Sequence, residues 1–475
     1  MPSGSLAARL RALVGDDGVV DHPDALGVYE CDGYTLERAT PELVVLPRTP
    51  DAVAAVVRLL WDEQIAFVPR GAGTGLSGGT LPVQAPVMIC TSRLNRIESI
   101  DRTNRRVVAQ AGVVNQWVSN AVRDAGLLYA PDPSSQPACT IGGNVAENSG
   151  GPHTLKYGVT TNHVLGVELV LPDGQVVTLG GPAEDRPGYD LVGLVVGSEG
   201  TFGIVTRATL RLTRSPEDYR TLLAVFDSVD AASEAVSGII ASGVVPAALE
   251  MMDQLILGAV EAAYHVGLPT DAGAVLLAEL DGPAVGLDAQ MARVEAVCRA
   301  HGARELRLAR DDAERAALWK ARKRAFGAVG RLAPSYCTQD GVVPRTRVPD
   351  IVRAIAAAGE RHRIRIGNVF HAGDGNIHPI LLFDERDPDE VARVLAAGRD
   401  ILEACVALGG SITGEHGIGV EKAAQMPLLF SPDDLLAMTR LRAVFDPEQR
   451  ANPHKIFPDA KVCVETRMPR RRAAV

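Results

Sequence analysis

The sequence predicts a chain of mixed α and β structure, in which an α/β part is followed by an α+β part. Across residues 41–213, short Val- and Ile-rich strand candidates alternate with helix candidates, as in an α/β domain. From residue 221 onward, the order of strands and helices indicates an antiparallel sheet with helices on one face. The polar segment 214–218 separates the two patterns and indicates a domain boundary. A chain of 475 residues has room for two or three domains with sizeable cores.

The expected elements follow from apolar runs and from helix start signals. Thr49-Pro50 precedes Asp51, a combination that favours a helix start. In the first part we expect strands 43–46, 65–68 and 167–171 and helices 51–63 and 115–125. In the second part we expect strands 221–226, 247–251 and 274–280 and helices 229–242 and 255–265. Residues 1–14 predict an amphipathic helix, and residues 431–458 predict a helical segment near the C-terminus.

Charge and composition exclude several classes of function. A formal net charge of −10 argues against nucleic acid as a partner, because phosphate binding requires a basic face, and we expect the basic cluster 467–472 to be a solvated end. The seven cysteines are scattered and never spaced as Cys-x-x-Cys, so we expect neither an iron–sulfur cluster nor a disulfide framework. No apolar run approaches about 18 residues, and the N-terminus lacks the apolar core of a signal peptide. We therefore expect no membrane span and a cytoplasmic location, with peripheral attachment to the inner membrane only through partners.

Residues 69–79 form a glycine-rich loop directly after an apolar strand candidate, with five glycines in eleven residues. Glycine permits positive φ and has no Cβ, so successive backbone N–H groups can converge on a phosphate. The loop is not a P-loop, since no Gly-Lys-Ser/Thr ends it, and Leu81-Pro82 follows where a dinucleotide fingerprint needs a helix. Taken alone, this segment is equally well explained as a tight surface turn.

Three further segments of the same half-chain, 131–135, 140–151 and 197–205, repeat this composition of glycine with Ser, Thr and Asn. A long diphosphate cofactor in a groove requires several such close backbone approaches and hydrogen-bond donors. The candidate cofactor-binding residues in the four segments are Arg70, Gly71, Gly73, Thr74, Gly75, Leu76, Ser77, Pro131, Asp132, Ser134, Ser135, Gly142, Asn144, Asn148, Gly150, Glu199, Gly200, Gly203, Ile204 and Val205.

These loops resemble the FAD-binding domain of the vanillyl-alcohol-oxidase and p-cresol-methylhydroxylase (PCMH) type, and the resemblance covers essentially the whole chain. Within that superfamily the chain is most similar to the flavin subunits of bacterial glycolate oxidases. The segments that carry this similarity are 29–33, 69–79, 131–151, 250–253, 340–345, 367–378 and 414–419. The resemblance implies FAD as the cofactor, and we expect it to be noncovalent because loop 69–79 has no His or Cys for attachment.

The resemblance also implies the domain organisation. We expect an N-terminal segment at 1–37 and a PCMH-type FAD-binding domain of two α/β subdomains at 38–215. An α+β substrate (cap) domain of the FAD-linked oxidase type, with an antiparallel sheet, is expected at 216–425. A helical segment at 426–475 is expected to return to the FAD-binding domain and to bring Asn452 to the cofactor.

His371 and His378 bracket a Gly-Asp-Gly-Asn turn, and Glu415-His416 lies in another glycine-rich turn. Two imidazoles and one carboxylate can hold a divalent metal with an open position, as in catalytic sites. The spacing differs from His-Glu-x-x-His, and each histidine taken alone is more often a core or surface residue. The resemblance implies that His371, His378 and Glu415 bind a metal, which we expect to be zinc, with manganese and iron as alternatives.

The reaction implied by the resemblance is the oxidation of a 2-hydroxy acid, with hydride transfer to FAD. A metal would lower the pKa of the substrate hydroxyl, and His416 matches the family's proposed base. Arg322 matches the family's carboxylate clamp, and a charge-assisted contact of this kind is worth roughly 1.5–3 kcal/mol. For Lys320, Lys323 and Arg324 we expect a solvated helix face.

The substrate is expected to be a small monocarboxylate, glycolate or D-lactate. In relatives that oxidise the dicarboxylate 2-hydroxyglutarate, polar residues stand at the positions of Phe326 and Ile380 and a lysine stands near Thr338. An unpaired second carboxylate would cost on the order of several kcal/mol.

Electrons must leave the flavin, and the resemblance implies a second flavin-type subunit and an iron–sulfur subunit as partners. Three alternatives stay open at this point. They are a self-sufficient D-lactate dehydrogenase of the same fold, a metal-dependent hydrolase, and a noncatalytic flavin-binding subunit.

Overall fold

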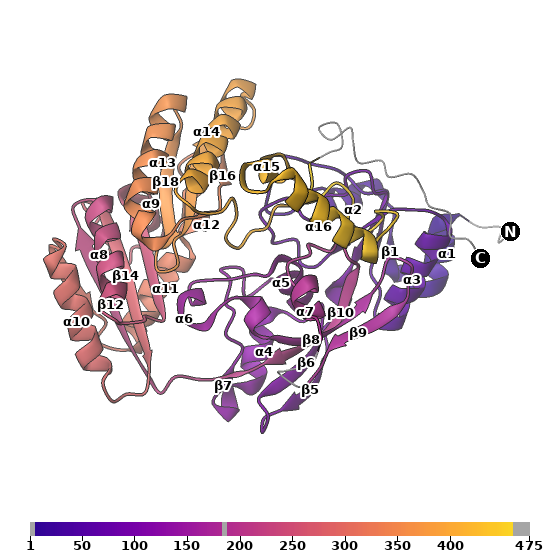
Figure 1. Ribbon diagram of the computed structural model, residues 1–475, viewed down its shortest axis with the longest axis horizontal. Coiled ribbons are helices and arrows are strands. Elements are labelled where there is room, and N and C mark those ends of the chain that lie inside the picture. The colour runs from indigo at the N-terminus through magenta and orange to yellow at the C-terminus, as the bar shows by residue number, and fades with distance from the viewer. Residues whose placement is uncertain (1–4, 183–187, 459–475) are drawn as a thin grey trace.

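The computed structural model describes residues 5–182 and 188–458, so the basic cluster 467–472 and Cys463 lie outside the described residues. Two bodies lie side by side in Figure 1, the first part in purple and the C-terminal part in pink to orange. The last helices, in yellow, lie over the first part. Among the described residues, all six cysteines are free. No helix in these ranges is both long enough and apolar enough to cross a membrane.

The first part contains a small, mostly parallel sheet. Its strands, in spatial order, are β1 (Val19–Val20), β2 (Leu43–Val45), β4 (Val87–Cys90) and β3 (Phe67–Arg70). β2, β4 and β3 run parallel, and β1 is antiparallel. The helices of this region are α1 (Leu6–Val14), α2 (Pro23–Leu26) and α3 (Pro50–Asp62). α1 and α3 bury their apolar sides against the sheet, and the Thr49 side chain caps α3 by accepting from Ala52 N–H, as its sequence predicts.

A second, antiparallel sheet completes the first part. Its strands, in spatial order, are β5 (Ile97–Asp101), β6 (Arg106–Gln110), β10 (Ile204–Arg211), β8 (Val164–Val170) and β9 (Val176–Gly180). β10 alternates buried and half-buried residues, so one face of this sheet meets the core. The associated helices are α4 (Asn115–Val122), α5 (Ile141–Glu147), α6 (Thr154–Tyr157) and α7 (Leu191–Val195). A two-stranded ribbon joins β7 (Leu127–Leu128) to β11 (Thr213–Arg214).

The C-terminal part is built on an eight-stranded antiparallel sheet. Its main path, in spatial order, is β15 (Glu305–Leu308), β12 (Asp218–Phe226), β14 (Ala274–Gly282), β13 (Ala248–Asp253), β18 (Arg365–His371), β19 (Asn376–Phe383) and β16 (Ser335–Thr338). β17 (Gly341–Val342) pairs with the start of β19. The hairpin β18–β19 pairs His371 with Asn376, and β13 pairs Glu250 with His371.

Helices cover both faces of this sheet, so the expectation of helices on one face only is wrong. One face carries α8 (Val229–Ala241), α10 (Leu287–Ala300), α13 (Val348–His362) and α14 (Pro388–Ala407). The other carries α9 (Gln254–Tyr264), α11 (Asp312–Lys323) and α12 (Ala325–Val329). The physical reason is that nearly every residue of β14 is apolar or buried, which leaves no face suited to water.

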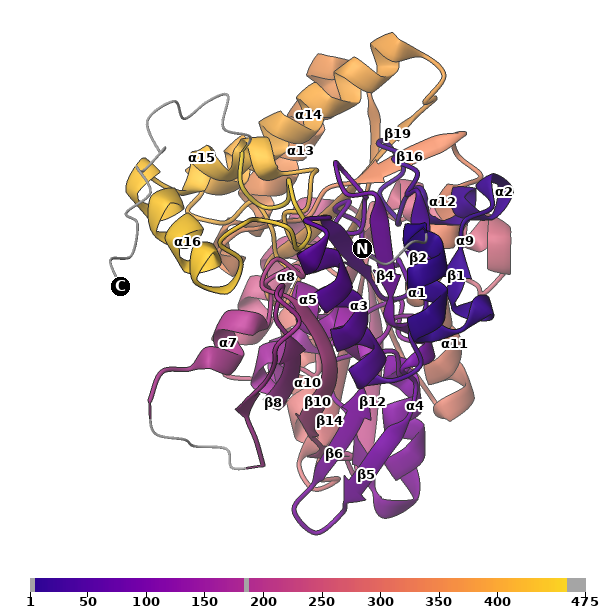
Figure 2. The same cartoon turned by 90° about the vertical axis from the view of Figure 1, so that its right-hand side faces the viewer.

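The chain then returns to the first part, where Figure 2 shows α15 (Met426–Leu429) and α16 (Pro432–Phe445) beside it. The helix expected at 431–458 ends at Phe445, because Pro447 cannot continue it. Residues 446–458 run back along β3, where Asn452 N–H donates to the Phe67 carbonyl at 2.8 Å. The Asn452 amide also donates to the carbonyls of Gly79 and Glu199 at 2.9 and 2.6 Å. The C-terminal segment therefore closes on the glycine-rich loops.

Candidate active site

A cavity of about 410 Å³ lies where the glycine-rich loops of the first part face the sheet of the C-terminal part. The predicted cofactor residues that line it are Gly71, Gly73, Thr74, Gly75, Leu76, Ser134, Ser135, Asn144 and Gly150. His371, His378, Glu415 and His416 line the same cavity. Segments more than 200 residues apart in sequence therefore share one site.

A smaller cavity of about 70 Å³ shares Gly71, Thr80, Gly143 and Glu147 with the main one. It is lined by further predicted residues, namely Arg70, Gly142, Glu199, Gly200, Gly203, Ile204, Val205 and Asn452. Ser77, Pro131, Asp132 and Asn148 line neither cavity. Oδ2 of Asp132 contacts Nδ1 of His153, and the Ser77 carbonyl accepts from Val420 N–H.

The first glycine-rich loop admits no larger side chain at its tightest points. Gly73 has φ +71°, and a Cβ there would lie 2.1 Å from Nη2 of Arg70. A Cβ on Gly71 would lie 2.5 Å from Oγ1 of Thr140. The Arg70 guanidinium is fixed by donation to the Cys31 carbonyl and to Thr80 Oγ1 at 2.9 and 3.0 Å. The loop is thus a rigid, backbone-lined wall suited to a close-lying phosphate.

Sequence reasoning missed several lining residues. Segment 32–36 forms one wall, and Gly33 N–H donates to the Gly75 carbonyl at 2.7 Å. Glu147, between the predicted residues Asn144 and Asn148, lines both cavities. Segment 32–36 overlaps residues 29–33, which carry part of the family resemblance but had no predicted role. That motif was the signal that could have identified this wall of the cavity.

Three side chains predicted as metal ligands converge in the structure. His371 ends β18, His378 lies in β19, and Glu415 lies in the loop before α15. The Nε2 atoms of His371 and His378 lie 3.3 and 3.2 Å from Oε1 of Glu415. The three ligand atoms lie within 4.8 Å of one another. Both imidazoles are buried, and their rings stand perpendicular with centroids 5.0 Å apart.

The electrostatics of this trio fit a cation. Burial opposes charge on His371, but the carboxylates of Glu250 and Glu415 raise its pKa well above the usual range. Burial also opposes charge on Glu415, yet His371 and His378 hold its pKa well below the usual range. Both ring nitrogens of His378 are buried without a hydrogen-bond partner. Buried imidazole nitrogens that face a charged carboxylate are a donor set that a divalent metal takes.

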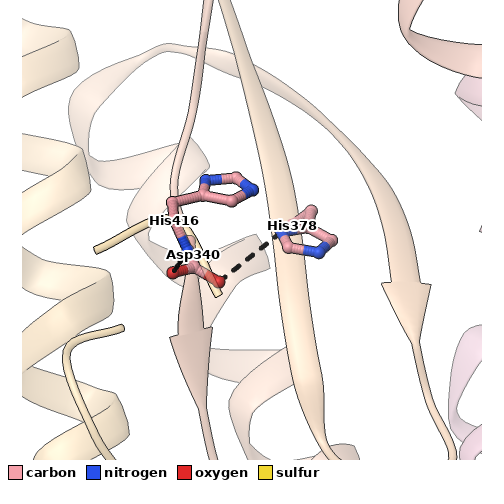
Figure 3. A group of neighbouring side chains, drawn as sticks. All are labelled: Asp340, His378 and His416. Carbon is pink, nitrogen blue, oxygen red and sulfur yellow. Dashed lines mark hydrogen bonds and ion pairs between the residues drawn. The ribbon is translucent and has the colours of Figure 1, made fainter. Parts of the chain in front are cut away.

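The loop that carries Glu415 and His416 is held by Asp340, which is fully buried. Figure 3 shows Asp340 with its neighbours His378 and His416. Its Oδ2 accepts from Thr413 Oγ1 at 2.6 Å and from the N–H groups of Gly414 and His416 at 2.8 and 3.0 Å. Asp340 also forms a cluster with His378 and His416 that could hold a cation by geometry alone. Because its Oδ2 already accepts these hydrogen bonds, we favour the trio with Glu415 as the metal site.

His416 lies over His378, with ring centroids 4.9 Å apart and ring planes inclined by 8°. Burial lowers its pKa to about 4, and the nearby Asp340 carboxylate offsets this only in part. The imidazole is therefore neutral at neutral pH and holds a lone pair that can accept a proton. Its Nδ1 has no hydrogen-bond partner.

Arg322, in α11, is absent from the cavity lining. The side chain is 1% exposed, and Nη2 lies 2.5 Å from Oε2 of Glu250. The prediction that Arg322 holds a substrate carboxylate stays a prediction. Lys323, expected on a solvated face, is 37% exposed, lines the cavity and lies 3.4 Å from Asp132.

Of the three positions that favour a monocarboxylate over a dicarboxylate, two line the cavity. Phe326 and Thr338 line the cavity, and the Phe326 ring lies 6.4 Å from the His378 ring. Ile380 is fully buried in β19 and is absent from the lining. Among the lining residues, Lys323 is the only lysine or arginine.

Comparison with known families agrees with this architecture. Residues 41–180 match the family described as FAD binding domain, and residues 215–456 match FAD linked oxidases, C-terminal domain. The chain belongs to the FAD-linked oxidases, and it is an FAD-dependent oxidoreductase.

Comparison with individual proteins gives more detail than the family does. The chain is 47% identical to the glycolate oxidase subunit GlcD of Escherichia coli, over 92% of this chain and 88% of that protein. It is 32% identical to the D-lactate dehydrogenase of Anaerostipes hadrus, over 94% of each. Its fold matches p-cresol methylhydroxylase with a TM-score of 0.82 at 16% identity, covering 96% of this chain and 97% of that one. The predicted PCMH-type fold is confirmed.

Proposed function

We propose that this chain oxidises a small 2-hydroxy monocarboxylate, glycolate to glyoxylate first of all, at the trio of His371, His378 and Glu415. One observation carries the proposal: this trio and His416 line the same cavity as the glycine-rich loops that would hold FAD. The similarity to a glycolate oxidase subunit supports glycolate. The similarity to a D-lactate dehydrogenase makes D-lactate the second candidate.

The chemistry follows from the residue types around the cavity. FAD, when bound, accepts a hydride from the α-carbon of the substrate. A divalent metal held by the trio, with zinc expected and manganese or iron as alternatives, would lower the pKa of the substrate hydroxyl. Neutral His416 would take the hydroxyl proton. Asp340 holds the loop that positions both His416 and Glu415.

We assign the substrate carboxylate to Arg322. Nε and Nη1 of its guanidinium are buried and have no hydrogen-bond partner, while Glu250 lies against Nη2. Leaving charged donors unsatisfied costs on the order of 1–3 kcal/mol each, and a carboxylate would relieve that cost. A dicarboxylate lacks a second partner, because the one lysine of the cavity lining already lies against Asp132.

Electrons would then pass from the flavin to a partner. The similar Escherichia coli protein is named as a subunit, which supports an assembly of several chains. We propose that the partners in this assembly are a second flavin-type subunit and an iron–sulfur subunit. Attachment to the inner face of a membrane would come through those partners.

The proposal is tested by steady-state turnover of the purified, FAD-loaded chain. Glycolate and D-lactate are compared as substrates, with an artificial dye as the electron acceptor. Elemental analysis of the same preparation measures bound metal. We expect turnover of glycolate, stoichiometric metal, and loss of both in His378→Ala with FAD retained. Flavin that neither acid reduces would contradict the proposed substrate class, and active protein without metal would contradict the proposed metal.

A further inference from the structure

Glu250 lies between two groups that the proposed function uses separately. It stands in β13 opposite His371 of β18, and its side chain is 0% exposed. Oε1 lies 2.7 Å from Nδ1 of His371, and Oε2 lies 2.5 Å from Nη2 of Arg322. A single buried carboxylate therefore contacts both an imidazole of the metal trio and the guanidinium assigned to the substrate.

The contact with His371 determines which ring nitrogen is available to a metal. A carboxylate 2.7 Å from Nδ1 requires the proton to be on that nitrogen. Nε2, which points to Glu415 at 3.3 Å, is then the ligand atom. Carboxylate partners of this kind orient metal-binding histidines and raise their basicity.

His378 has no equivalent partner among the described residues. Its Nδ1 lies 3.9 Å from Oδ1 of Asp340, beyond hydrogen-bond distance, and neither ring nitrogen has a hydrogen-bond partner. His371 is therefore the ligand whose orientation the protein fixes before a metal binds.

The contact with Arg322 fixes the other end of the carboxylate. A buried guanidinium held at Nη2 alone keeps Nε and Nη1 in a set direction for another acceptor. We infer that Glu250 is a positioning residue that sets the metal-binding tautomer of His371 and holds Arg322 for the substrate carboxylate. This inference rests on the proposed function.

Glu250→Gln tests both contacts, because an amide cannot replace the carboxylate at both ends. With its oxygen toward His371, the NH₂ group faces the Arg322 donors. With its oxygen toward Arg322, the NH₂ group faces Nδ1 of His371 and favours the proton on Nε2, where the metal should bind. One of the two functions must fail in either orientation.

The experiment measures zinc affinity of FAD-loaded protein by competition with a chromogenic chelator, together with KM and kcat for glycolate. For Glu250→Gln we expect zinc affinity to fall about 10–100-fold, as for other outer partners of metal ligands, if the amide oxygen turns to Arg322, and KM for glycolate to rise if it turns to His371. Glu279→Gln is the matched control, because Glu279 is equally buried on the adjacent strand β14 and pairs with Arg315 at 2.6 Å. It should lower thermal stability and leave zinc affinity unchanged.

Zinc affinity and KM of Glu250→Gln both within twofold of the parent would overturn the inference. If Glu250→Gln does not fold, Glu250→Asp replaces it, since the shorter carboxylate keeps the charge but withdraws from both partners. The same loss of zinc affinity is expected, and parental affinity would overturn the inference. A parent protein that oxidises glycolate but binds no zinc, manganese or iron would refute the proposed metal, and the inference with it.

Discussion

His153 joins the two parts of the molecule, and removing its charge should weaken their attachment in a pH-dependent way. Nδ1 lies 2.9 Å from Oδ2 of Asp132 in the first part, and Nε2 lies 3.7 Å from Oε1 of Glu279 in β14. Glu279 also accepts from Arg315 Nη2 and from Trp319 Nε1, each at 2.6 Å. The perturbation is His153→Gln, which keeps hydrogen-bonding capacity but has no charge.

The magnitude follows from the pKa of His153. Burial by itself would lower it, but Asp132 and then Glu279 outweigh burial and raise the pKa from 6.5 to about 10. At about 1.4 kcal/mol per pKa unit, this difference corresponds to roughly 4–5 kcal/mol. The side chain is 19% exposed, and solvent screening reduces that figure, so we expect about 2–4 kcal/mol.

The sign is determined by which state binds the proton more tightly. The raised pKa belongs to the folded state, so the stabilisation is complete below about pH 6.5 and disappears as the pH rises toward about 10. Urea unfolding of FAD-loaded parent and His153→Gln, measured from pH 6 to pH 10, should show a free-energy difference that shrinks steadily. A difference that is constant or grows with pH would refute the reasoning.

Three other changes test the site. Gly73→Ala should give protein with little FAD, measured by flavin absorbance per chain, because its Cβ would meet Arg70; full flavin content would remove this loop from the cofactor site. Asp340→Asn should slow flavin reduction by at least about tenfold with FAD retained, since it weakens the acceptor that holds His416; a parental rate would contradict that role. Arg322→Lys keeps the charge but loses the fork, so KM for glycolate should rise, and an unchanged KM would place the carboxylate elsewhere.

Local signals in the sequence predicted much of the fold. The strand expected at 274–280 is β14, and the helix expected at 51–63 is α3, because apolar runs and the helix start signal at Thr49-Pro50 act over short distances. Helices on both faces were not foreseen, since an all-apolar strand does not reveal how many layers cover it. The helix predicted at 431–458 runs past Pro447, which cannot continue a helix.

The sequence predicts which residue types form the candidate site, but not which of them contact one another. The trio came from glycine-rich turns and family resemblance, and the structure brings it together. The contact of Glu250 with His371 spans 121 positions and depends on the register of β13 against β18, which no local pattern encodes. The same holds for segment 32–36, which lines the cavity through tertiary contacts alone.

The most direct test of the account is anaerobic rapid mixing of FAD-loaded protein with glycolate, following the bleaching of the flavin. The parent is compared with metal-depleted parent and with His378→Ala, all at equal flavin content. We expect rapid bleaching in the parent. Bleaching should be at least about a hundredfold slower in the other two proteins, and added metal should restore it only in the metal-depleted parent. Bleaching at the parental rate in metal-depleted protein would contradict a metal-assisted oxidation at this site.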